Sequence, residues 1–439
     1  MRSLTDAREL AYELLTRVAE TDSYINLLLP AMLRGKSLSD PDRGLVQELS
    51  YGSLRWQLQY DRIIDELTQH RELSNRVRII LRLGLHQLFR MRIPEHAAIN
   101  ESVELAKRFE PRASGLINAV LRNAQRAGLE RLLEDLAAAE DSIGKLALRY
   151  SHPEWVVSAL KTSLELDDRG AELESLLAAN NETPLVNLAG LSPEALTRLT
   201  EAGLEPGSSS PIGFRLRGNP ESFIGADVRV QDEGSQLVAL ALMELAPEKP
   251  AVLDMCSGPG GKSAVLQSRL GGGSLTCMEP NPARAKLVRD ALGDSAAEVI
   301  VAPGQDAHKT SYDAVLLDAP CSGLGSLRRK PESRWRKSLA QLPQLIKLQQ
   351  ELLDAGIDAL KPGGVLLYST CSPVTSETNA QIAQALEEHP EIELVDLKPV
   401  LRKLSPQLKL NPKRKTVQLW THLHLTDAMF MAALRKKLG

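Results

Sequence analysis

The amino-acid sequence predicts a multidomain protein: an all-α N-terminal domain, a small α+β middle segment and a doubly wound α/β domain. Two patterns predict this architecture. Up to about residue 140 the apolar residues recur at helical spacing, whereas after residue 226 short apolar runs alternate with helix-length segments. A length of 439 residues is enough for about three folding units. We therefore expect domains at 1–140, 151–225 and 226–439.

The first two domains are predicted from local signals. Apolar residues within 4–18 follow one helical face, Pro41 after Asp40 marks a helix start, and no strand is expected before residue 140. In the middle segment, two helix-like stretches precede the apolar residues 183–188, which could form a strand, and a Gly/Ser/Pro-rich stretch follows. These signals favour a small α+β unit.

Short apolar strands define the C-terminal domain. Five are expected, at residues 251–255, 275–278, 299–301, 314–317 and 365–368. Because helices separate them, they should pair in parallel, and ligands bind beyond the carboxyl ends of such strands. Functional residues should therefore directly follow the strands.

Composition and charge exclude several classes of protein. Hydrophobic residues make up 43% and charged residues 25%, which excludes a disordered, collagen-like or disulfide-scaffold chain. No apolar run is long enough to span a bilayer, and the first residues lack a signal-peptide core. Four cysteines without close pairs indicate a reducing compartment, so we expect a cytoplasmic protein. A net charge of −3 means that any nucleic-acid binding must depend on local patches.

A glycine-rich loop follows the first predicted strand. It reads Asp254-Met255-Cys256-Ser257-Gly258-Pro259-Gly260-Gly261-Lys262-Ser263. A Walker A loop would need glycine at position 256 and the dinucleotide fingerprint would need it at position 263, so both patterns fail by one residue. A loop for S-adenosylmethionine needs only a tight glycine turn close to the ligand. That interpretation is favoured over an ordinary strand-to-helix turn.

Two acidic residues follow the next two strands. Glu279 stands where an acid can bind both ribose hydroxyls of an adenosine. Asp306 follows the third strand and could face the adenine. For each, the alternative is a solvated carboxylate in a turn.

Two cysteines follow the fourth and fifth strands. The motifs are Asp318-Ala319-Pro320-Cys321-Ser322-Gly323-Leu324-Gly325 and Tyr368-Ser369-Thr370-Cys371-Ser372. Zinc is disfavoured because the cysteines lack metal-ligand spacing, and a disulfide is disfavoured in the cytosol. Thiol chemistry beside a cofactor is therefore favoured over two small buried hydrophobes.

Such a pair of thiols suits methylation of a pyrimidine at C5. A thiolate that adds to C6 of cytosine converts C5 into a nucleophile able to attack an activated methyl group. An acid must neutralise the charge that forms on the ring, and Asp318 is placed to supply it.

A basic segment follows the first cysteine motif. Six of the ten residues at 328–337 are basic, and Trp335 lies among them. Cations beside an aromatic ring suit an RNA backbone and a stacked base, the alternative being a solvated basic loop. The basic residues 413–415 are expected to form an ordinary surface turn.

The motifs at 318–325 and 369–372 resemble the paired signatures of RNA 5-methylcytosine methyltransferases. Leu-Arg-Leu-Gly at 81–84 and Ile-Asn-Ala-Val-Leu-Arg at 117–122 resemble the NusB fold. Joined in one chain, these features resemble the bacterial RsmB/Sun/Fmu family, whose members methylate a cytosine in 16S ribosomal RNA. The resemblance implies a NusB-like RNA-binding domain and a Rossmann-like class I methyltransferase domain.

The resemblance also implies roles for single residues. Cys371 would attack C6, Cys321 would assist release of the methylated base, and Asp318 would contact the cytosine and the methionine end of the cofactor. No metal is expected, and the protein should be a monomer. The residues implied to bind S-adenosylmethionine are Cys256, Ser257, Gly258, Pro259, Gly260, Gly261, Lys262, Glu279 on the ribose, Asp306 near the adenine, and Asp318.

The sequence departs from the family pattern at two places, and two rival functions stay open. Leu185-Val186-Asn187 replaces the usual Arg-Val-Asn, and Ala428 stands where the family has glycine. A transfer-RNA methyltransferase is disfavoured by the NusB-like domain. A non-catalytic ribosome-assembly factor is disfavoured by the intact Cys371 and cofactor loop.

Overall fold

A computed structural model describes residues 6–21 and 23–438, which form two compact units. The first contains the chain up to Ser158 together with Arg329–Arg336, and the second contains Ala159–Arg328 and the chain from Lys337. A short piece of the sequence after the first cysteine motif therefore belongs to the N-terminal unit.

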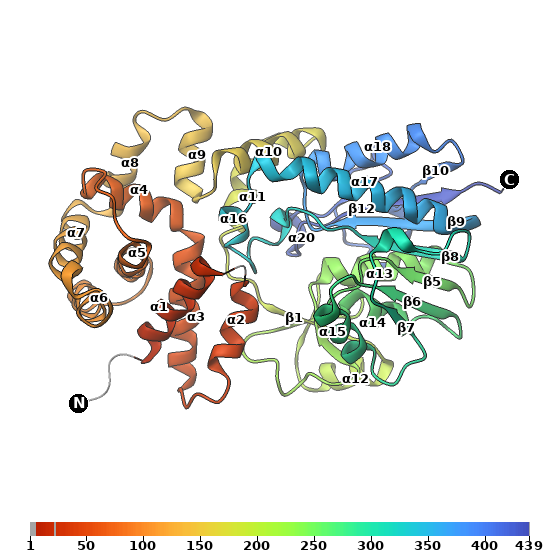
Figure 1. Ribbon diagram of the computed structural model, residues 1–439, viewed down its shortest axis with the longest axis horizontal. Coiled ribbons are helices and arrows are strands. Elements are labelled where there is room, and N and C mark those ends of the chain that lie inside the picture. The colour runs from red at the N-terminus through yellow and green to blue at the C-terminus, as the bar shows by residue number, and fades with distance from the viewer. Residues whose placement is uncertain (1–5, 22, 439) are drawn as a thin grey trace. The chain divides into compact units, whose positions relative to one another are not determined.

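The described residues of the N-terminal unit form helices joined by loops and no strand, as predicted (Figure 1). Helix α3 begins where Asp40-Pro41 predicted, with the Ser39 hydroxyl accepting a hydrogen bond from the Asp42 N–H at 3.3 Å. The core lies around α5, whose apolar face is buried. The helices are α1 (Asp6–Glu20), α2 (Ile25–Leu33), α3 (Asp40–Arg55), α4 (Gln57–Leu67), α5 (Asn75–Arg90), α6 (Glu95–Phe109), η1 (Pro111–Ala113), α7 (Ser114–Ala127), α8 (Leu129–Ala137) and α9 (Ser142–Tyr150).

The prediction that residues 328–337 form an open basic loop is wrong, whereas their contact with RNA stays a prediction. Residues 329–336, which include the short helix α16 (Ser333–Arg336), pack into the helical unit, and none of their side chains is fully exposed. Trp335 donates its Nε1–H to the Leu54 carbonyl at 2.7 Å. Two guanidinium groups of this segment, those of Arg334 and Arg336, donate hydrogen bonds to backbone carbonyls, which accept them as a phosphate would.

Arg336 is the clearest case, because its guanidinium caps the C-terminal end of α1. It donates hydrogen bonds to the carbonyls of Val18 at 2.6 Å, Thr21 at 3.0 Å and Ser23 at 2.8 Å. Carbonyls at a helix end lack partners within the helix and carry partial negative charge. Arg336 therefore satisfies acceptors that would otherwise depend on water.

We expect Arg336→Met to lower the free energy of unfolding of the N-terminal unit by about 2 kcal/mol, because bonds to a charged donor are lost. Hydrogen exchange of the amides at the end of α1 should accelerate correspondingly. Lys337→Met is the matched control, since Lys337 makes none of these contacts. Equal exchange in both variants would contradict the capping role.

The second unit contains a small antiparallel sheet with strand order β2-β3-β1-β4. Its first strand begins at Val186, later than the predicted residues 183–188, because Pro184 has no N–H to donate to a neighbouring strand. Asn187 of the divergent segment lies inside this strand, opposite Arg215. The elements are α10 (Glu154–Leu166), which begins in the first unit, η2 (Gly170–Glu172), α11 (Leu173–Ala179), β1 (Val186–Gly190), α12 (Pro193–Glu201), β2 (Glu205–Pro206), β3 (Gly213–Leu216) and β4 (Val228–Val230).

The larger sheet has strand order β10-β12-β9-β8-β5-β6-β7, with β11 paired to β12. All five predicted strands are present and pair in parallel, whereas the antiparallel strands β10, β11 and β12 were not predicted. The strands are β5 (Ala251–Asp254), β6 (Ser274–Met278), β7 (Glu298–Ile300), β8 (Tyr312–Asp318), β9 (Leu360–Thr370), β10 (Ile392–Val395), β11 (Val417–Gln418) and β12 (Phe430–Lys436).

Helices cover both faces of this sheet, which confirms the doubly wound fold. Figure 1 shows α17 and α18 along one face and α13, α14 and α15 along the other. Successive residues of β9 are buried on opposite faces of the sheet: Leu366 packs on the α17 side and Leu367 on the α13 side. The helices are α13 (Glu233–Leu245), α14 (Gly261–Gln267), α15 (Pro282–Leu292), η3 (Gly304–Asp306), η4 (Leu324–Ser326), η5 (Leu339–Gln341), α17 (Leu342–Ala359), η6 (Thr375–Glu377), α18 (Asn379–Glu388), α19 (Lys398–Leu404) and α20 (Thr421–His424).

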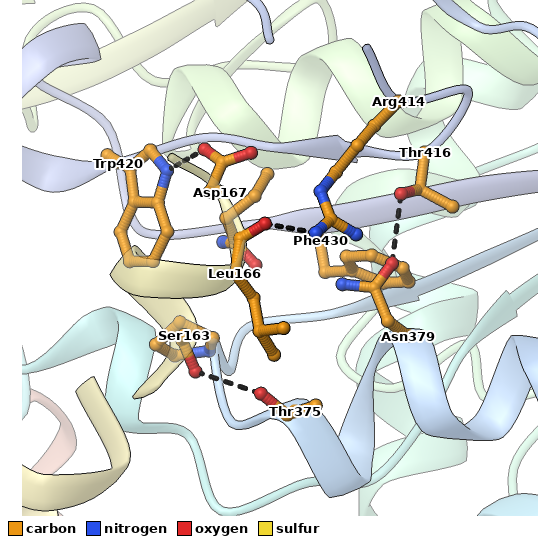
Figure 2. A pocket seen from close by; sticks show the side chains of 11 residues that line it. Ser163, Leu166, Asp167, Thr375, Asn379, Arg414, Thr416, Trp420 and Phe430 are labelled. Carbon is orange, nitrogen blue, oxygen red and sulfur yellow. Dashed lines mark hydrogen bonds between the residues drawn. The ribbon is translucent and has the colours of Figure 1, made fainter. Parts of the chain in front are cut away.

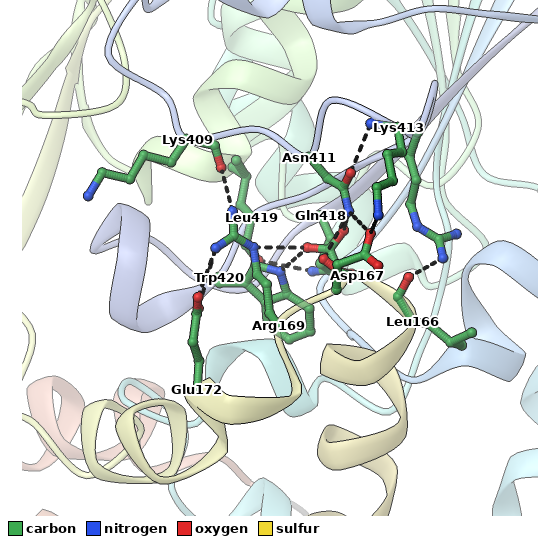
Figure 3. A network of polar contacts seen from close by, with 12 residues as sticks. Leu166, Asp167, Arg169, Glu172, Lys409, Asn411, Lys413, Gln418, Leu419 and Trp420 are labelled. Atoms are coloured by element: carbon green, nitrogen blue, oxygen red, sulfur yellow. Dashed lines mark hydrogen bonds and ion pairs between the residues drawn. The ribbon is translucent and has the colours of Figure 1, made fainter.

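A polar network holds residues 409–420 against the turn that follows α10 (Figure 3). The buried carboxylate of Asp167 accepts a hydrogen bond from Trp420 Nε1 at 2.7 Å and another from Asn411 Nδ2 at 2.9 Å. The same turn engages the predicted basic turn 413–415: Lys413 forms an ion pair with Asp168 at 3.1 Å. These cations therefore serve contacts within the unit.

A small pocket lies beside this network (Figure 2). Arg414 donates across it to the Leu166 carbonyl, and the Ser163 and Thr375 hydroxyls lie 3.3 Å apart. Its volume is about 10 Å³, which holds no more than one water molecule. Among the described residues, no helix is both long enough and apolar enough to cross a membrane.

Candidate active site

The carboxyl ends of β5, β8 and β9 lie side by side and carry the loops predicted to be functional. Strand β5 has β6 on one side and β8 on the other, so the strand order reverses there, and such a reversal opens a crevice for ligands. Asp318, the last residue of β8, pairs in register with Ser369 of β9. The two cysteine motifs consequently start at the same edge.

The glycine loop after β5 packs so tightly that no side chain fits at Gly258 or Gly260. A Cβ atom at Gly258 would lie 2.2 Å from Glu279 Oε2, and one at Gly260 would lie 2.6 Å from Ala291 Cβ. Gly260 also has a φ of 98°, which disfavours other residues. The Ser257 N–H is bonded to the Met278 carbonyl at 3.0 Å. The loop thus brings bare backbone to the crevice, which fits the close approach of an adenosyl cofactor.

Glu279 and Asp306 differ in their surroundings. Glu279 is buried against the glycine loop, accepts the Asn281 N–H at 3.0 Å and lies 3.5 Å from Arg284 Nη2. Asp306 is exposed in η3, and among described residues no side chain is bonded to its carboxylate. Its turn nevertheless adjoins the loop, since a Cβ atom at Gly304 would lie 2.9 Å from the Met255 carbonyl oxygen.

The two cysteine sulfurs meet at this edge. Cys321 Sγ lies 3.5 Å from Cys371 Sγ, a hydrogen-bond distance between free thiols, and both side chains are partly exposed. The hydrogen bond to Cys371, burial, and the nearby carboxylates of Glu377 and Asp318 all raise the pKa of the Cys321 thiol. Either sulfur can be the donor in this contact, and the raised pKa favours Cys321 as the protonated partner.

Asp318 is paired, which the sequence did not indicate. Its Oδ2 lies 2.6 Å from Lys262 Nζ and its Oδ1 accepts the Ser369 hydroxyl at 2.9 Å. Burial lowers the pKa of the Lys262 ammonium, but Asp318, with smaller contributions from Cys371 and Asp254, raises it, and the net pKa is raised. The expected lone acid is thus an ion pair whose cation comes from the glycine loop.

Two further residues at this edge were missed by sequence reasoning. Gln231 follows β4 and is buried, yet neither of its side-chain amide atoms has a hydrogen-bond partner in the structure. Its Nε2 would lie 3.6 Å from a Cβ atom at Gly261, so it borders the glycine loop. Glu377, between β9 and α18, is bonded to both cysteine motifs. Only their positions in the folded chain reveal them.

The divergent residue Ala428 also reaches this site. Its N–H donates to the Gly325 carbonyl at 2.9 Å, and the Gly325 N–H donates to the Cys371 carbonyl at 2.8 Å. A Cβ atom at Gly325 would lie 2.2 Å from the Ala428 carbonyl oxygen. Glycine is thus required at position 325, while the methyl group of Ala428 is accommodated within a buried turn.

Asp254 makes the stability of the second unit depend on pH. It is fully buried at the end of β5, and burial, opposed by the hydrogen bond from Ser263 Oγ at 2.7 Å, raises its pKa to about 7. In the unfolded chain the pKa is about 3.9, so between about pH 4 and 7 the folded state keeps a proton that the unfolded state releases. Stability therefore falls as the pH rises through this window.

We expect Asp254→Asn to remove this fall in the free energy of unfolding with rising pH, which amounts to at most about 4 kcal/mol. Urea unfolding of the C-terminal unit at pH 5 and pH 8 would measure it. Asp290→Asn, an exposed change on α15, should keep the wild-type pH dependence. If the stability of Asp254→Asn falls between pH 5 and pH 8 as much as that of the wild type, Asp254 is already ionised at pH 5 in the folded protein.

Known proteins resemble both units. Residues 5–126 match the NusB family, and residues 241–435 match the family described as 16S rRNA methyltransferase RsmB/F. A Mycobacterium tuberculosis (strain H37Rv) protein named as a methyltransferase is 40% identical, covering 99% of this chain and 97% of its own. Ribosomal RNA small subunit methyltransferase B of Pseudomonas putida is 37% identical, covering 87% and 89%. The crystal structure of PH0851 shares the fold, with a TM-score of 0.80 at 22% identity over 98% of this chain and 99% of that one.

Proposed function

Because the chain belongs to the RsmB/F family of 16S rRNA methyltransferases, we propose that it methylates C5 of a cytosine in 16S ribosomal RNA. We further propose a transient covalent bond between Cys371 and C6 of the base. The observation that carries this proposal is the 3.5 Å contact between Cys321 and Cys371 at the ligand edge of the sheet.

S-adenosylmethionine is the cofactor of such an enzyme, and the glycine loop suits it. The backbone of residues 256–262 would surround it, with Glu279 placed for the ribose and Asp306 for the adenine. When bound, the cofactor supplies an electrophilic methyl group on a sulfonium, which C5 of the base accepts. The methyl donor needs no phosphate site, in agreement with the failed Walker and dinucleotide patterns.

We assign the attack to Cys371 rather than to Cys321, as the resemblance to RNA 5-methylcytosine methyltransferases implies. The raised pKa keeps Cys321 protonated, and its S–H can stabilise a thiolate on Cys371. Attack forms the bond between Cys371 Sγ and C6 and makes C5 nucleophilic. After methylation a water molecule acting as base takes the C5 proton, the C5–H electron pair reforms the C5–C6 double bond, and Cys371 leaves C6 as a thiolate. Cys321, in contact with the departing sulfur, assists this release.

The ion pair of Lys262 and Asp318 supplies the polar groups at the site proposed for the cytosine. In the structure Asp318 accepts hydrogen bonds and cannot itself supply a proton while it is paired with Lys262. We assign to the pair the neutralisation of the charge that develops on the pyrimidine ring, with the Lys262 ammonium as its positive member. This refines the expectation that Asp318 acts alone.

The test is methylation of 16S ribosomal RNA lacking the modification, followed by nucleoside mass spectrometry. We expect 5-methylcytidine to form, and RNA carrying 5-fluorocytidine to give a covalent complex, because fluorine blocks loss of the C5 substituent. A different methylated nucleoside would overturn the C5 assignment. Preferential methylation of transfer RNA would favour the rival substrate, and no methylation of either RNA would favour a non-catalytic factor.

A further inference from the structure

Glu377 contacts the residues that directly follow the two cysteines, and it is not itself a reacting group in the chemistry described above. It ends η6, after β9, and its side chain is fully buried. Among the described residues, no Lys, Arg or His side chain forms an ion pair with it. Burying a carboxylate in this way is costly unless hydrogen bonds satisfy its oxygens.

Four hydrogen bonds satisfy the carboxylate of Glu377. Ser322 donates its backbone N–H to Oε1 at 2.7 Å and its hydroxyl to Oε2 at 2.6 Å. The Ser372 hydroxyl donates to Oε2 at 2.6 Å, and Gln349 Nε2 donates to Oε1 at 3.2 Å. The two serines directly follow the two cysteines in the sequence. One side chain therefore joins both cysteine-bearing loops.

We propose that Glu377 is a positioning residue that sets the separation of the two thiols by holding Ser322 and Ser372 on one carboxylate. The inference rests on the proposed function, because this separation matters if both sulfurs act on one base. The N–H of Ser322 belongs to the planar peptide that joins it to Cys321, so its hydrogen bond orients the backbone from which that thiol projects.

The charge of Glu377 affects a second measurable quantity, the pKa of the Cys321 thiol. The titratable groups that face Cys321 are Cys371, Glu377, Asp318 and Tyr368. Glu377 is one of the carboxylates that raise the pKa of the Cys321 thiol. Removing its charge should lower that pKa, whereas losing a residue with only a packing role would leave the pKa unchanged.

The experiment compares Glu377→Ala and Glu377→Gln with the wild type. In Glu377→Ala we expect the covalent complex with 5-fluorocytidine RNA to form about 10- to 100-fold more slowly, because displacements of about 1 Å have effects of this size. Binding of S-adenosylmethionine should not change. In Glu377→Gln, which keeps an acceptor oxygen and the size of the side chain, the rate should fall less. Iodoacetamide labelling of Cys321, followed by peptide mass spectrometry, should show its pH midpoint lowered by about 1 unit.

Glu387→Gln is the matched control, since Glu387 is exposed on the following helix, α18. It should retain the wild-type rate and labelling profile. A wild-type rate of complex formation in Glu377→Ala would overturn the proposal, as would an unchanged Cys321 labelling profile in Glu377→Gln. If Glu377→Ala fails to bind S-adenosylmethionine, the Gln variant alone decides.

Failure of the proposed function is distinguishable from failure of this inference. If the wild type forms no complex with 5-fluorocytidine RNA, the proposed function fails. Cross-linking of Cys321 to Cys371 by a short bifunctional thiol reagent needs no RNA and still measures their separation. Equal cross-linking yields in the wild type and Glu377→Ala would overturn the positioning role.

Discussion

Cys371→Ala should lower the rate of methyl transfer to 16S ribosomal RNA by at least about 10³-fold, because it removes the group that we propose makes C5 nucleophilic. Without the thiolate, C5 of cytosine has no means of attacking the methyl group. The cofactor is assigned to the backbone of residues 256–262, which the substitution leaves unchanged, so affinity for S-adenosylmethionine should be close to that of the wild type. Single-turnover transfer of a labelled methyl group, with calorimetric titration of the cofactor, measures both effects.

Cys277→Ala is the matched control for the loss of a thiol. Cys277 is buried in the core on β6, so its removal should cost some stability and leave the methylation rate unchanged. If Cys371→Ala methylates the RNA as fast as Cys277→Ala does, Cys371 is not the nucleophile. If Cys371→Ala fails to bind the cofactor, the serine variant at the same position replaces it in the assay.

The meeting of Cys321 and Cys371 could be predicted from the sequence because topology alone dictates it. Both motifs directly follow parallel strands, and β8 and β9 are neighbours with Asp318 opposite Ser369. Residues two or three positions further along must then lie at the same edge. The glycine loop was predictable for the same reason, since it follows β5, the other neighbour of β8.

The partners of the buried charges could not be predicted in this way. Lys262 is 56 residues from Asp318 in the sequence, and Glu377 is 55 residues from Ser322. Periodicity and strand order specify which edge a residue reaches, but a contact between two side chains depends on how loops pack beyond the strands. The antiparallel strands β10 to β12 were missed because the predicted alternation of strands and helices covers only the parallel part of the sheet.

The segment 329–336 shows the opposite failure, in which composition misled. A run of cations normally lies in solvent, so six basic residues among ten predicted a loop open to RNA. In the folded chain the guanidinium groups of Arg334 and Arg336 donate hydrogen bonds to backbone carbonyls, those of Arg336 at the end of α1. Charge alone does not distinguish a carbonyl cluster from a phosphate as the partner of a guanidinium.

Cys321→Ala should slow release rather than attack, so that a covalent complex of protein and RNA accumulates. The substitution removes the thiol that lies 3.5 Å from Cys371 Sγ and leaves the proposed nucleophile in place. We expect the complex to survive denaturing electrophoresis at a level at least about tenfold above that of the wild type, while turnover falls. Its formation should require S-adenosylmethionine, and digestion by ribonuclease should restore the mobility of the free protein.

The double variant Cys321→Ala/Cys371→Ala separates this mechanism from incidental cross-linking. Because Cys371 is the only thiol proposed to bond to the base, the complex should disappear in the double variant, whatever the RNA concentration. The raised pKa of Cys321 adds a constraint on the single variant: a group that acts as a neutral thiol should be partly replaced by serine, which also carries a proton on its side chain. Cys321→Ser should therefore accumulate less complex than Cys321→Ala. Free RNA at wild-type turnover in Cys321→Ala would instead mean that Cys371 leaves the methylated base unaided, and that the contact between the sulfurs serves only to favour the thiolate before attack.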